Sequence, residues 1–420
     1  MNHFFADPTK RSRLMYLFEA TLEYLISILV TGSFLATLTK ELGISDSLTG
    51  ILSSIISLGC LFQLASLSIR RTKVKRLVIL FSIINQGLFM LLYVIPLVCF
   101  ERNTKICLFV ILILLAYFVY NVAHPKKINW LMSSVEDSHR GGFTANKEII
   151  SLISGMFFSF GMGAVIDYFS EIGKMRVAFI ISAIVIFVLM VAHSITMTLA
   201  VEKTTPHSKP QNLLQTINEL VKNKNIIHII IIFLLHYVST YISTPFYATY
   251  QIGELGLSLK FISTFTICGS ISRICVSKFW GSYADKNSFA AMIEKCFIFS
   301  ALGQICIIFA IPSIGKVMFV LYYILHGISL GGINSALINL IFDYVPVEKR
   351  ADSLAVTQSL AGLTGFLGTL CISPLVTYIQ DNGDTFLGMP IYAQQFITII
   401  ALLLTLLAII YTRVVFLKKK

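Results

Sequence analysis

The hydropathy of the sequence changes twice between residues 177 and 250. The run VAFIISAIVIFVLMVAHSITMTLA (177–200) is almost wholly apolar, VEKTTPHSKPQNLLQTINELVKNKN (201–225) is polar and basic, and IIHIIIIFLLHYVSTYISTPFYATY (226–250) is apolar again. A helix of about 20 apolar residues crosses the hydrocarbon core of a bilayer. This part of the sequence therefore predicts two membrane-spanning helices joined by a polar linker outside the membrane.

The rest of the chain has the same composition. Of its 420 residues, 56% are hydrophobic and 13% are charged, whereas soluble domains carry about 25% charged residues. Within lipid, backbone amides must pair internally, which leaves helices and closed barrels as spanning structures. The apolar runs are much longer than barrel strands of about ten residues. We therefore expect an all-α integral membrane protein.

Twelve apolar segments can be marked along the sequence. They cover residues 14–39, 47–69, 77–99, 106–134, 142–169, 176–200, 226–250, 258–281, 289–312, 315–344, 351–379 and 391–416. The linker separates six segments from six. The predicted domains are an N-terminal six-helix bundle (1–201), a basic linker (202–225) and a C-terminal six-helix bundle (226–420).

A weak internal repeat agrees with this division. A shift of 210 residues places Val135, Arg140, Ala145, Gly155 and Tyr168 on Val345, Arg350, Ala355, Gly365 and Tyr378. Two halves related by duplication are a common plan among secondary transporters. We expect the two bundles to be pseudo-symmetric.

The distribution of lysine and arginine predicts the orientation. With both termini in the cytoplasm, 24 of the 33 basic residues fall on the inner side, and seven fall outside: Lys40, Arg102, Lys105, Lys174, Arg176, Lys260 and Lys316. Basic loops stay on the cytoplasmic side. We expect a multi-pass protein of the cell membrane, and we attribute the net charge of +12 to orientation rather than to nucleic-acid binding.

Several kinds of active site lack their motifs in this sequence. None of the eight cysteines forms a C-x-x-C pair, and neither H-E-x-x-H nor G-x-x-x-x-G-K-[ST] occurs. These patterns carry metal, redox and nucleotide chemistry. We expect no metal site, no cofactor, no direct use of ATP and no enzymatic activity.

Short loop motifs carry a family resemblance. Gly281-Ser-Tyr-Ala-Asp285-Lys286 resembles the G-x-x-x-D-R/K signature of the major facilitator superfamily, and the acidic residues before Arg140 and Arg350 resemble its loops before the fifth and eleventh helices. The loop 70–76 keeps the basic residues but lacks the glycine and aspartate, and the fifth segment lacks the proline of the antiporter motif. Import and export therefore both stay open.

The resemblance implies a fold and a mechanism. It implies a central cavity lined by helices one, four, seven and ten. The two halves would meet through helices two, five, eight and eleven, and the remaining four helices would support these from outside. The function implied is secondary active transport of a small organic solute by alternating access, coupled to H+, in a monomer. The alternatives are a non-transporting sensor or assembly factor with this fold, and an intramembrane enzyme.

Charged residues at membrane depth are functional candidates, because they are costly there. Glu19 and Glu23 lie four residues apart and so on one face of segment one. Lys126 and Lys127 lie at a matching depth in segment four. We predict that Glu23 pairs with Lys126 or Lys127 beside the cavity. Alternatively, Glu19 and one lysine reach the cytoplasmic interface through their long side chains.

Other polar residues fall on the expected cavity helices. His236 and His326 lie near mid-membrane in segments seven and ten, and are either proton or solute contacts or packing residues. Asn121 and Asn334 add amide groups, and several tyrosines add aromatic hydroxyls. This mixed lining suits an organic solute.

Two pairs of residues are predicted to close the cytoplasmic side. Glu148 and Arg273 are opposite charges at similar depth in segments five and eight, and the 210-residue shift maps them onto Gln358 and Gln63. We predict an ion pair and an amide pair, unless Arg273 bonds carbonyls of its own half. Asp285, with Gly281 and Lys286, is predicted to form a weaker latch with Arg140 or Lys147, unless it lies in a solvated loop.

Overall fold

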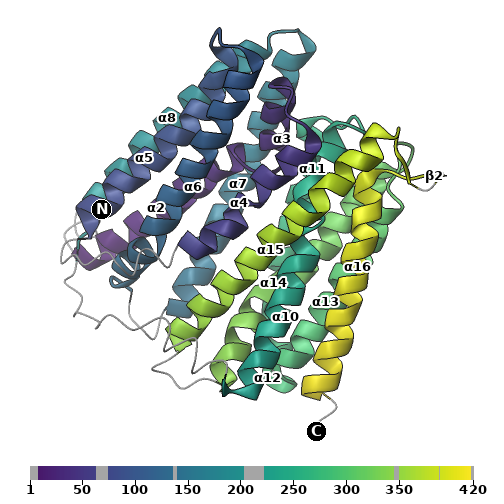
Figure 1. Cartoon of the computed structure of the whole chain (residues 1–420). Helices are drawn as coiled ribbons and strands as arrows, with labels where there is room; N and C mark the ends of the chain where they lie inside the picture. Colours follow the sequence, from purple (N-terminus) through teal and green to yellow (C-terminus); the bar gives the residue numbers. More distant parts are fainter. Residues whose placement is uncertain are drawn as a thin grey trace. The chain divides into compact units, whose positions relative to one another are not determined.

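The structure is a computed structural model that describes residues 8–62, 74–135, 140–202, 222–344, 350–386 and 388–417. The helices of the first half are α2 (Pro8–Leu29), α3 (Gly32–Glu41), α4 (Asp46–Phe62), α5 (Lys75–Val94) with the short η2 (Ile95–Leu97), α6 (Arg102–Met132), α7 (Arg140–Glu171) and α8 (Met175–Leu199) (Figure 1). The helices of the second half are α10 (Lys224–Tyr241), α11 (Thr244–Ile252), α12 (Leu259–Lys286), α13 (Phe289–Ile308), α14 (Gly315–Tyr344), α15 (Arg350–Asp381) and α16 (Ala393–Thr412) with η5 (Arg413–Leu417). Strands β1 (Thr385–Phe386) and β2 (Met389–Pro390) pair antiparallel.

The helices have the length and composition that a membrane requires. Among the described residues, eleven helical stretches are long and apolar enough to cross a bilayer. The 17-residue α4 ends at Phe62, where the described residues stop. The prediction of a multi-pass helical membrane protein is confirmed. The arrangement of twelve helices in two six-helix bundles remains a prediction.

The first and seventh segments are each broken at the same position of the repeat. The chain leaves the helix after Leu29 and starts α3 at Gly32, whose φ of +53° is a left-handed conformation that favours glycine. The seventh segment breaks after Tyr241, and Pro245 lies in the first turn of α11, where its missing N–H costs no hydrogen bond. The 210-residue shift carries Gly32 onto residue 242. The two breaks therefore support the internal repeat.

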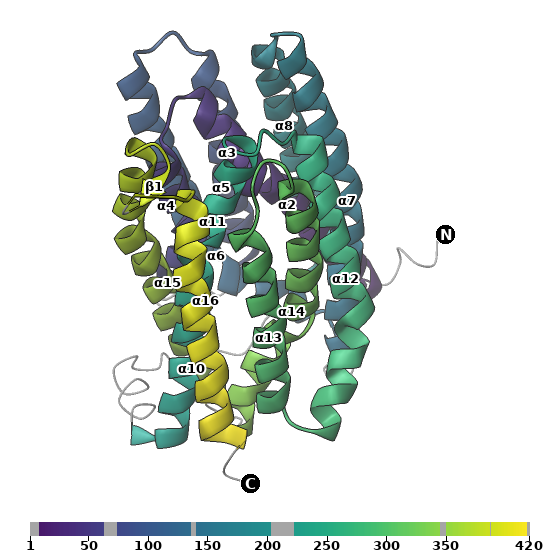
Figure 2. The same ribbon diagram turned by 90° about the vertical axis from the view of Figure 1, so that its right-hand side faces the viewer.

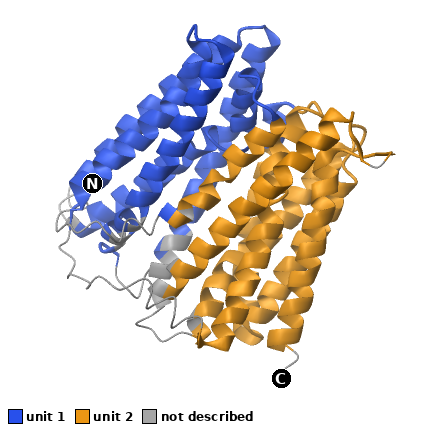
Figure 3. Ribbon diagram, viewed as in Figure 1, with its two compact units in different colours: residues 1–45, 62–209, 258–263 blue, residues 46–61, 210–257, 264–420 orange. Residues whose placement is uncertain are grey.

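The described helices form two compact units (Figure 3). Unit 1 comprises residues 1–45, 62–209 and 258–263, and unit 2 comprises residues 46–61, 210–257 and 264–420. Helix α4 thus joins unit 2 and the start of α12 joins unit 1, so these units differ from the predicted bundles. In unit 1, α2 packs on α7 and α8, and α5 packs on α6 and α8. In unit 2, α13 lies beside α14 and α16, and α10 lies beside α15 (Figures 1 and 2).

Two helix pairs expected from the family resemblance are in contact within the units. In unit 2, Ser57 of α4 donates to the carbonyl of Gly362 in α15 at 2.5 Å, and Gln380 of α15 donates to Asp46 of α4 at 3.0 Å. In unit 1, the N–H groups of Leu259 and Lys260 at the start of α12 donate to the carboxylate of Asp167 in α7 at 2.9 and 2.7 Å. Segment two therefore contacts segment eleven, and segment five contacts segment eight.

Glycines allow α12 and α14 to approach closely. A Cβ atom on Gly327 would lie 2.1 Å from the carbonyl oxygen of Gly269, which no real Cβ tolerates. We predict that Gly327→Ala lowers the free energy of unfolding by about 1–3 kcal/mol through overpacking. Gly161→Ala is the matched control, since its Cβ would meet no atom within 4 Å. Thermal unfolding of both purified variants checks this, and equal melting temperatures would refute the close approach.

Candidate functional site

A cluster of ionisable side chains lies inside unit 1. Glu19 and Glu23 come from successive turns of α2, Lys127 from α6, and His193 from α8. The ammonium Nζ of Lys127 lies 2.8 Å from a carboxylate oxygen of Glu19 and also bonds Glu23. Only 4% of the Lys127 side chain and 2% of the Glu19 side chain are exposed. One buried ammonium group therefore serves two carboxylates.

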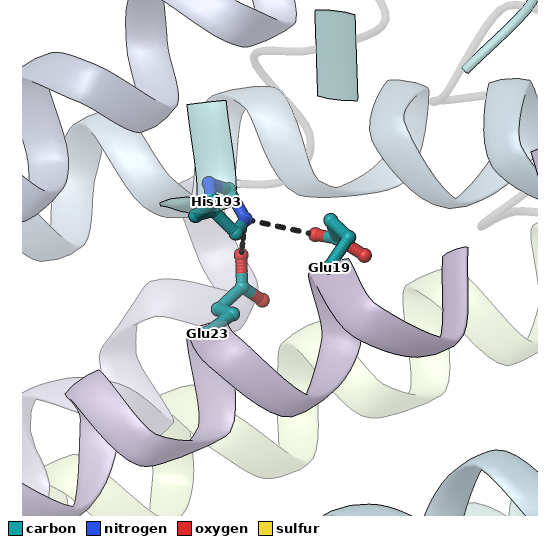
Figure 4. Close-up of side chains that lie close together, drawn as sticks. All are labelled: Glu19, Glu23 and His193. Carbon is teal, nitrogen blue, oxygen red and sulfur yellow. Dashed lines mark hydrogen bonds and ion pairs between the residues drawn. The ribbon is translucent and has the colours of Figure 1, made fainter. Parts of the chain in front are cut away.

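His193 completes the cluster on the α8 side. Its Nε2 lies 3.2 Å from Glu19 Oε1 and 3.8 Å from Glu23 Oε2 (Figure 4). The amide nitrogen of Gln86 in α5 lies 3.1 Å from His193 Nδ1. With the amide in this orientation Nδ1 accepts, and a ring proton on Nε2 faces Glu19. Glu19 is thus held as a carboxylate by two donors.

Glu23 is the accessible member of the cluster. About 21% of its side chain is exposed, and Tyr120 of α6 donates a hydrogen bond to it at 3.3 Å. It opens onto a small hollow within unit 1 that is also lined by Phe81, Ser82, Asn85, Tyr120, Ala123, His124 and Lys127. The buried Nε2 of His124 has no hydrogen-bond partner in the described part of the chain. The hollow measures about 10 Å³, which is about the room for one water molecule, and Glu23 and His124 both line it.

The charge balance of the cluster depends on His193. Two carboxylates face the Lys127 ammonium and the His193 imidazole, and the half-buried Lys147 of α7 also interacts electrostatically with Glu19 and Glu23. With a neutral imidazole, one negative charge of the carboxylates has no partner charge inside the cluster. An uncompensated buried charge is costly, and an ionisable group there tends to neutralise instead. One additional proton, or one additional cation, would make the cluster neutral.

The same side chains resemble a set of metal ligands. Ligand atoms of Glu19, Glu23 and His193 all lie within 4.8 Å of one another, and carboxylate oxygen with imidazole nitrogen is a donor set that Zn²⁺ accepts. The ammonium of Lys127, however, already bonds both carboxylates. In this chain, Lys127 supplies the positive charge that a metal ion would bring.

The predicted pairing of a glutamate in segment one with a lysine in segment four is present, through Lys127. Lys126 is partly exposed and forms no ion pair among the described residues, so Lys127 is the lysine of this pair, and a place of Lys126 on the solute path remains a prediction. Glu19 and Lys127 are buried, which excludes the alternative that they reach the cytoplasmic interface. Asn121 is also buried and donates to the carbonyl of Tyr117 in its own helix.

The polar candidates of the second half lie among aromatic rings of unit 2. The ring of His326 stacks on Tyr322 with centroids 5.2 Å apart, and the ring of His236 lies 5.7 Å from that of Phe297. Their helices, α14 and α10, are in contact as expected. Asn334 is exposed on α14. The roles of these three residues remain predictions.

The gate and latch residues are distributed over both units. Glu148 belongs to unit 1, whereas Arg273 and the half-buried Gln358 belong to unit 2. Gln63 lies outside the described residues, as does the side chain of Arg140. Gly281, Asp285 and Lys286 are exposed near the end of α12. The gate and the latch therefore remain predictions.

Sequence reasoning did not find His193, Gln86 or His124. The family resemblance placed the third and sixth helices outside the cavity helices, which directed attention away from Gln86 and His193. The signal was nonetheless present, since His193 is an ionisable residue deep in segment six. Contact between α2 and α8 brings this histidine to the glutamates.

A multi-pass helical protein with buried charges inside one of its units is a candidate membrane transport protein, and comparisons with known proteins support this class. The model of the Major Facilitator Superfamily matches residues 17–369, and the chain belongs to that family. No curated protein matches by sequence.

Several solved structures of transporters share the fold. A mutant of the nucleoside transporter NupG gives a TM-score of 0.74 at 15% identity, with 96% of this chain and 100% of that chain covered. A bacterial homologue of the iron transporter ferroportin gives 0.69 at 13% identity, covering 96% and 97%. The D-xylose–proton symporter gives 0.64 at 12% identity, covering 95% and 97%. At these identities the likeness concerns the fold alone.

Proposed function

We propose that this protein is a proton-coupled secondary transporter that moves a small organic solute by alternating access, with Glu23 as the group that carries the coupling proton. The observation that carries this proposal is the sharing of Lys127 between Glu19 and Glu23. Lys127 neutralises one carboxylate, and Glu19 has His193 as a second donor. Glu23 has Tyr120 as its second donor, and it is the accessible carboxylate of the two, so a proton reaches it more readily.

The hollow beside Glu23 measures about 10 Å³ in this conformation, and the proposal requires that it widens during the transport cycle to admit the solute. Serine, asparagine, tyrosine and histidine side chains line that hollow and present both hydrogen-bond donors and acceptors. Such groups suit a hydroxylated or heterocyclic solute, and nucleosides and pentoses are named for two of the structural relatives. Protonation of Glu23 would break its ion pair with Lys127. Proton binding would thereby change the contacts between α2 and α6.

The remaining parts of the proposal follow the sequence predictions. The protein acts as a monomer in the cell membrane with both termini in the cytoplasm. His236, His326, Asn121 and Asn334 contribute polar contacts along the solute path. The pairs Glu148–Arg273 and Gln63–Gln358 close the cytoplasmic side, with Asp285 and Arg140 as an additional latch.

Solute-dependent proton flux tests this function. The purified protein is reconstituted into liposomes that enclose a pH-sensitive dye, and nucleosides, D-xylose and Mn²⁺ are added outside in turn. We expect an organic solute to change the internal pH in proteoliposomes and not in empty liposomes. If radiolabelled solutes enter without any proton movement, proton coupling is wrong. If only Mn²⁺ enters, the solute class is wrong.

A further inference from the structure

A second hollow of about 550 Å³ lies in unit 1, and its lining is strongly basic. Lys40, Arg102, Lys105 and Arg176 line it, and Glu41 is the one acidic residue among the lining residues. These four are the majority of the seven cations predicted to lie outside the cytoplasm. Basic residues are otherwise kept from that side. The presence of four cations in one hollow therefore indicates that they have a function there.

Helix ends add to the positive potential. Helices α6 and α8 begin at Arg102 and Met175, and both residues line the hollow. The N-terminal end of a helix carries a partial positive charge and normally attracts acidic residues. Neither helix has an acidic residue in its first turn, although Glu101 directly precedes α6, and α8 has no side-chain cap. Both helices instead place an arginine there.

Two of the cations are held in place by backbone carbonyls. Arg102 donates to the carbonyl of Gly43, and Lys105 donates to the carbonyl of Pro96 at 3.3 Å. The turn at Gly43 has a φ of +66°, and a Cβ there would lie 2.5 Å from the guanidinium of Arg102. Guanidinium and ammonium groups have five and three N–H donors. Each fixed cation therefore keeps donors for a ligand.

Apolar side chains also line the hollow. Phe179 and Leu42 are 3% and 5% exposed, and these two buried residues are called its floor. We propose that this hollow binds a phosphate-bearing anion, either the headgroup of an anionic phospholipid or a soluble phosphate ester. Arginine and lysine donate charge-assisted hydrogen bonds to phosphate oxygens, and the floor receives the adjoining carbon atoms. The proposal stands apart from the proposed transport function.

Binding of two probes tests this site and distinguishes the two sources. Purified full-length protein is incubated with phosphatidylglycerol, with phosphatidylcholine as the neutral comparison, and separately with glycerol 3-phosphate. Retained molecules are counted by native mass spectrometry. The test variant is Arg102→Gln/Arg176→Gln, and the control is Lys174→Gln, an exposed cation that does not line the hollow. The variant Arg102→Lys/Arg176→Lys keeps both positive charges, so it distinguishes a loss of charge from a folding defect.

We expect the wild type, the Lys174→Gln protein and the double lysine variant to retain a phosphate-bearing probe. The double glutamine variant should bind it about tenfold or more weakly, since it loses two charge-assisted bonds. If the double glutamine variant loses only phosphatidylglycerol, the hollow is a lipid site. If it loses glycerol 3-phosphate, the hollow is a site for soluble anions. Equal retention of both probes by the wild type and the double glutamine variant would overturn the proposal.

Discussion

Lys127→Ala is expected to produce the largest loss of stability of any single substitution in unit 1. It leaves the carboxylates of Glu19 and Glu23 in a buried place without their shared ammonium group. Removing one partner of a buried ion pair costs about 3–5 kcal/mol, because the other charge stays behind unpaired. The free energy of unfolding should fall by that amount, as measured by chemical unfolding of the purified protein in detergent.

Lys126→Ala is the matched control for this substitution. It removes the same side chain one residue earlier, where no ion pair is formed among the described residues, and it should change stability little. The Lys127→Ala protein should also gain affinity for Zn²⁺, because Glu19, Glu23 and His193 then offer ligands without a competing ammonium group. Thermal stabilisation by Zn²⁺ in the variant and not in the wild type is the readout. Equal stability of the two lysine variants would contradict the cluster.

Glu23→Gln is expected to abolish accumulation driven by a pH gradient. A gradient of one pH unit is worth about 1.4 kcal/mol for each proton, which supports a roughly tenfold concentration ratio for one coupled proton. Glutamine cannot take up that proton, so the ratio in the variant should stay near one. Exchange of labelled for unlabelled solute should persist, because it needs no net proton movement. Uptake and exchange in proteoliposomes measure both.

Glu171→Gln is the control for this prediction. Glu171 is exposed at the end of α7, and its replacement should leave accumulation unchanged. A Glu23→Gln protein that still accumulates solute tenfold would show that another group carries the proton. Loss of accumulation and exchange together would indicate that Glu23 contacts the solute or is needed for the conformational change.

The fold could be predicted far better than the site, and the reason is physical. Membrane helices are long apolar runs that composition alone reveals, and the 30 to 32 residues of α6, α7, α14 and α15 follow directly from their sequences. The break at Gly32 was not predicted. An apolar run does not reveal where the backbone leaves the helix, because the side chains on both sides are equally suited to the membrane.

The site depends on which face of each helix carries a side chain. The spacing of Glu19 and Glu23 fixes one face of α2, and the depth of the lysines fixes their level in α6. Successive residues of a helix point about 100° apart, so depth cannot distinguish Lys126 from Lys127. His193 required knowledge of the contact between α2 and α8, which no local pattern contains. The pair of Glu148 and Arg273 depends on the placement of two separate units and remains a prediction for the same reason.

Infrared difference spectroscopy of the reconstituted protein between acidic and alkaline pH tests most directly whether Glu23 takes up a proton inside the membrane. We predict a protonated-carboxyl band at acidic pH in the wild type, sensitive to exchange into deuterium oxide, and we predict that Glu23→Gln removes it while Glu171→Gln leaves it unchanged. A spectrum of the Glu23→Gln protein that keeps the band at full intensity would contradict the account.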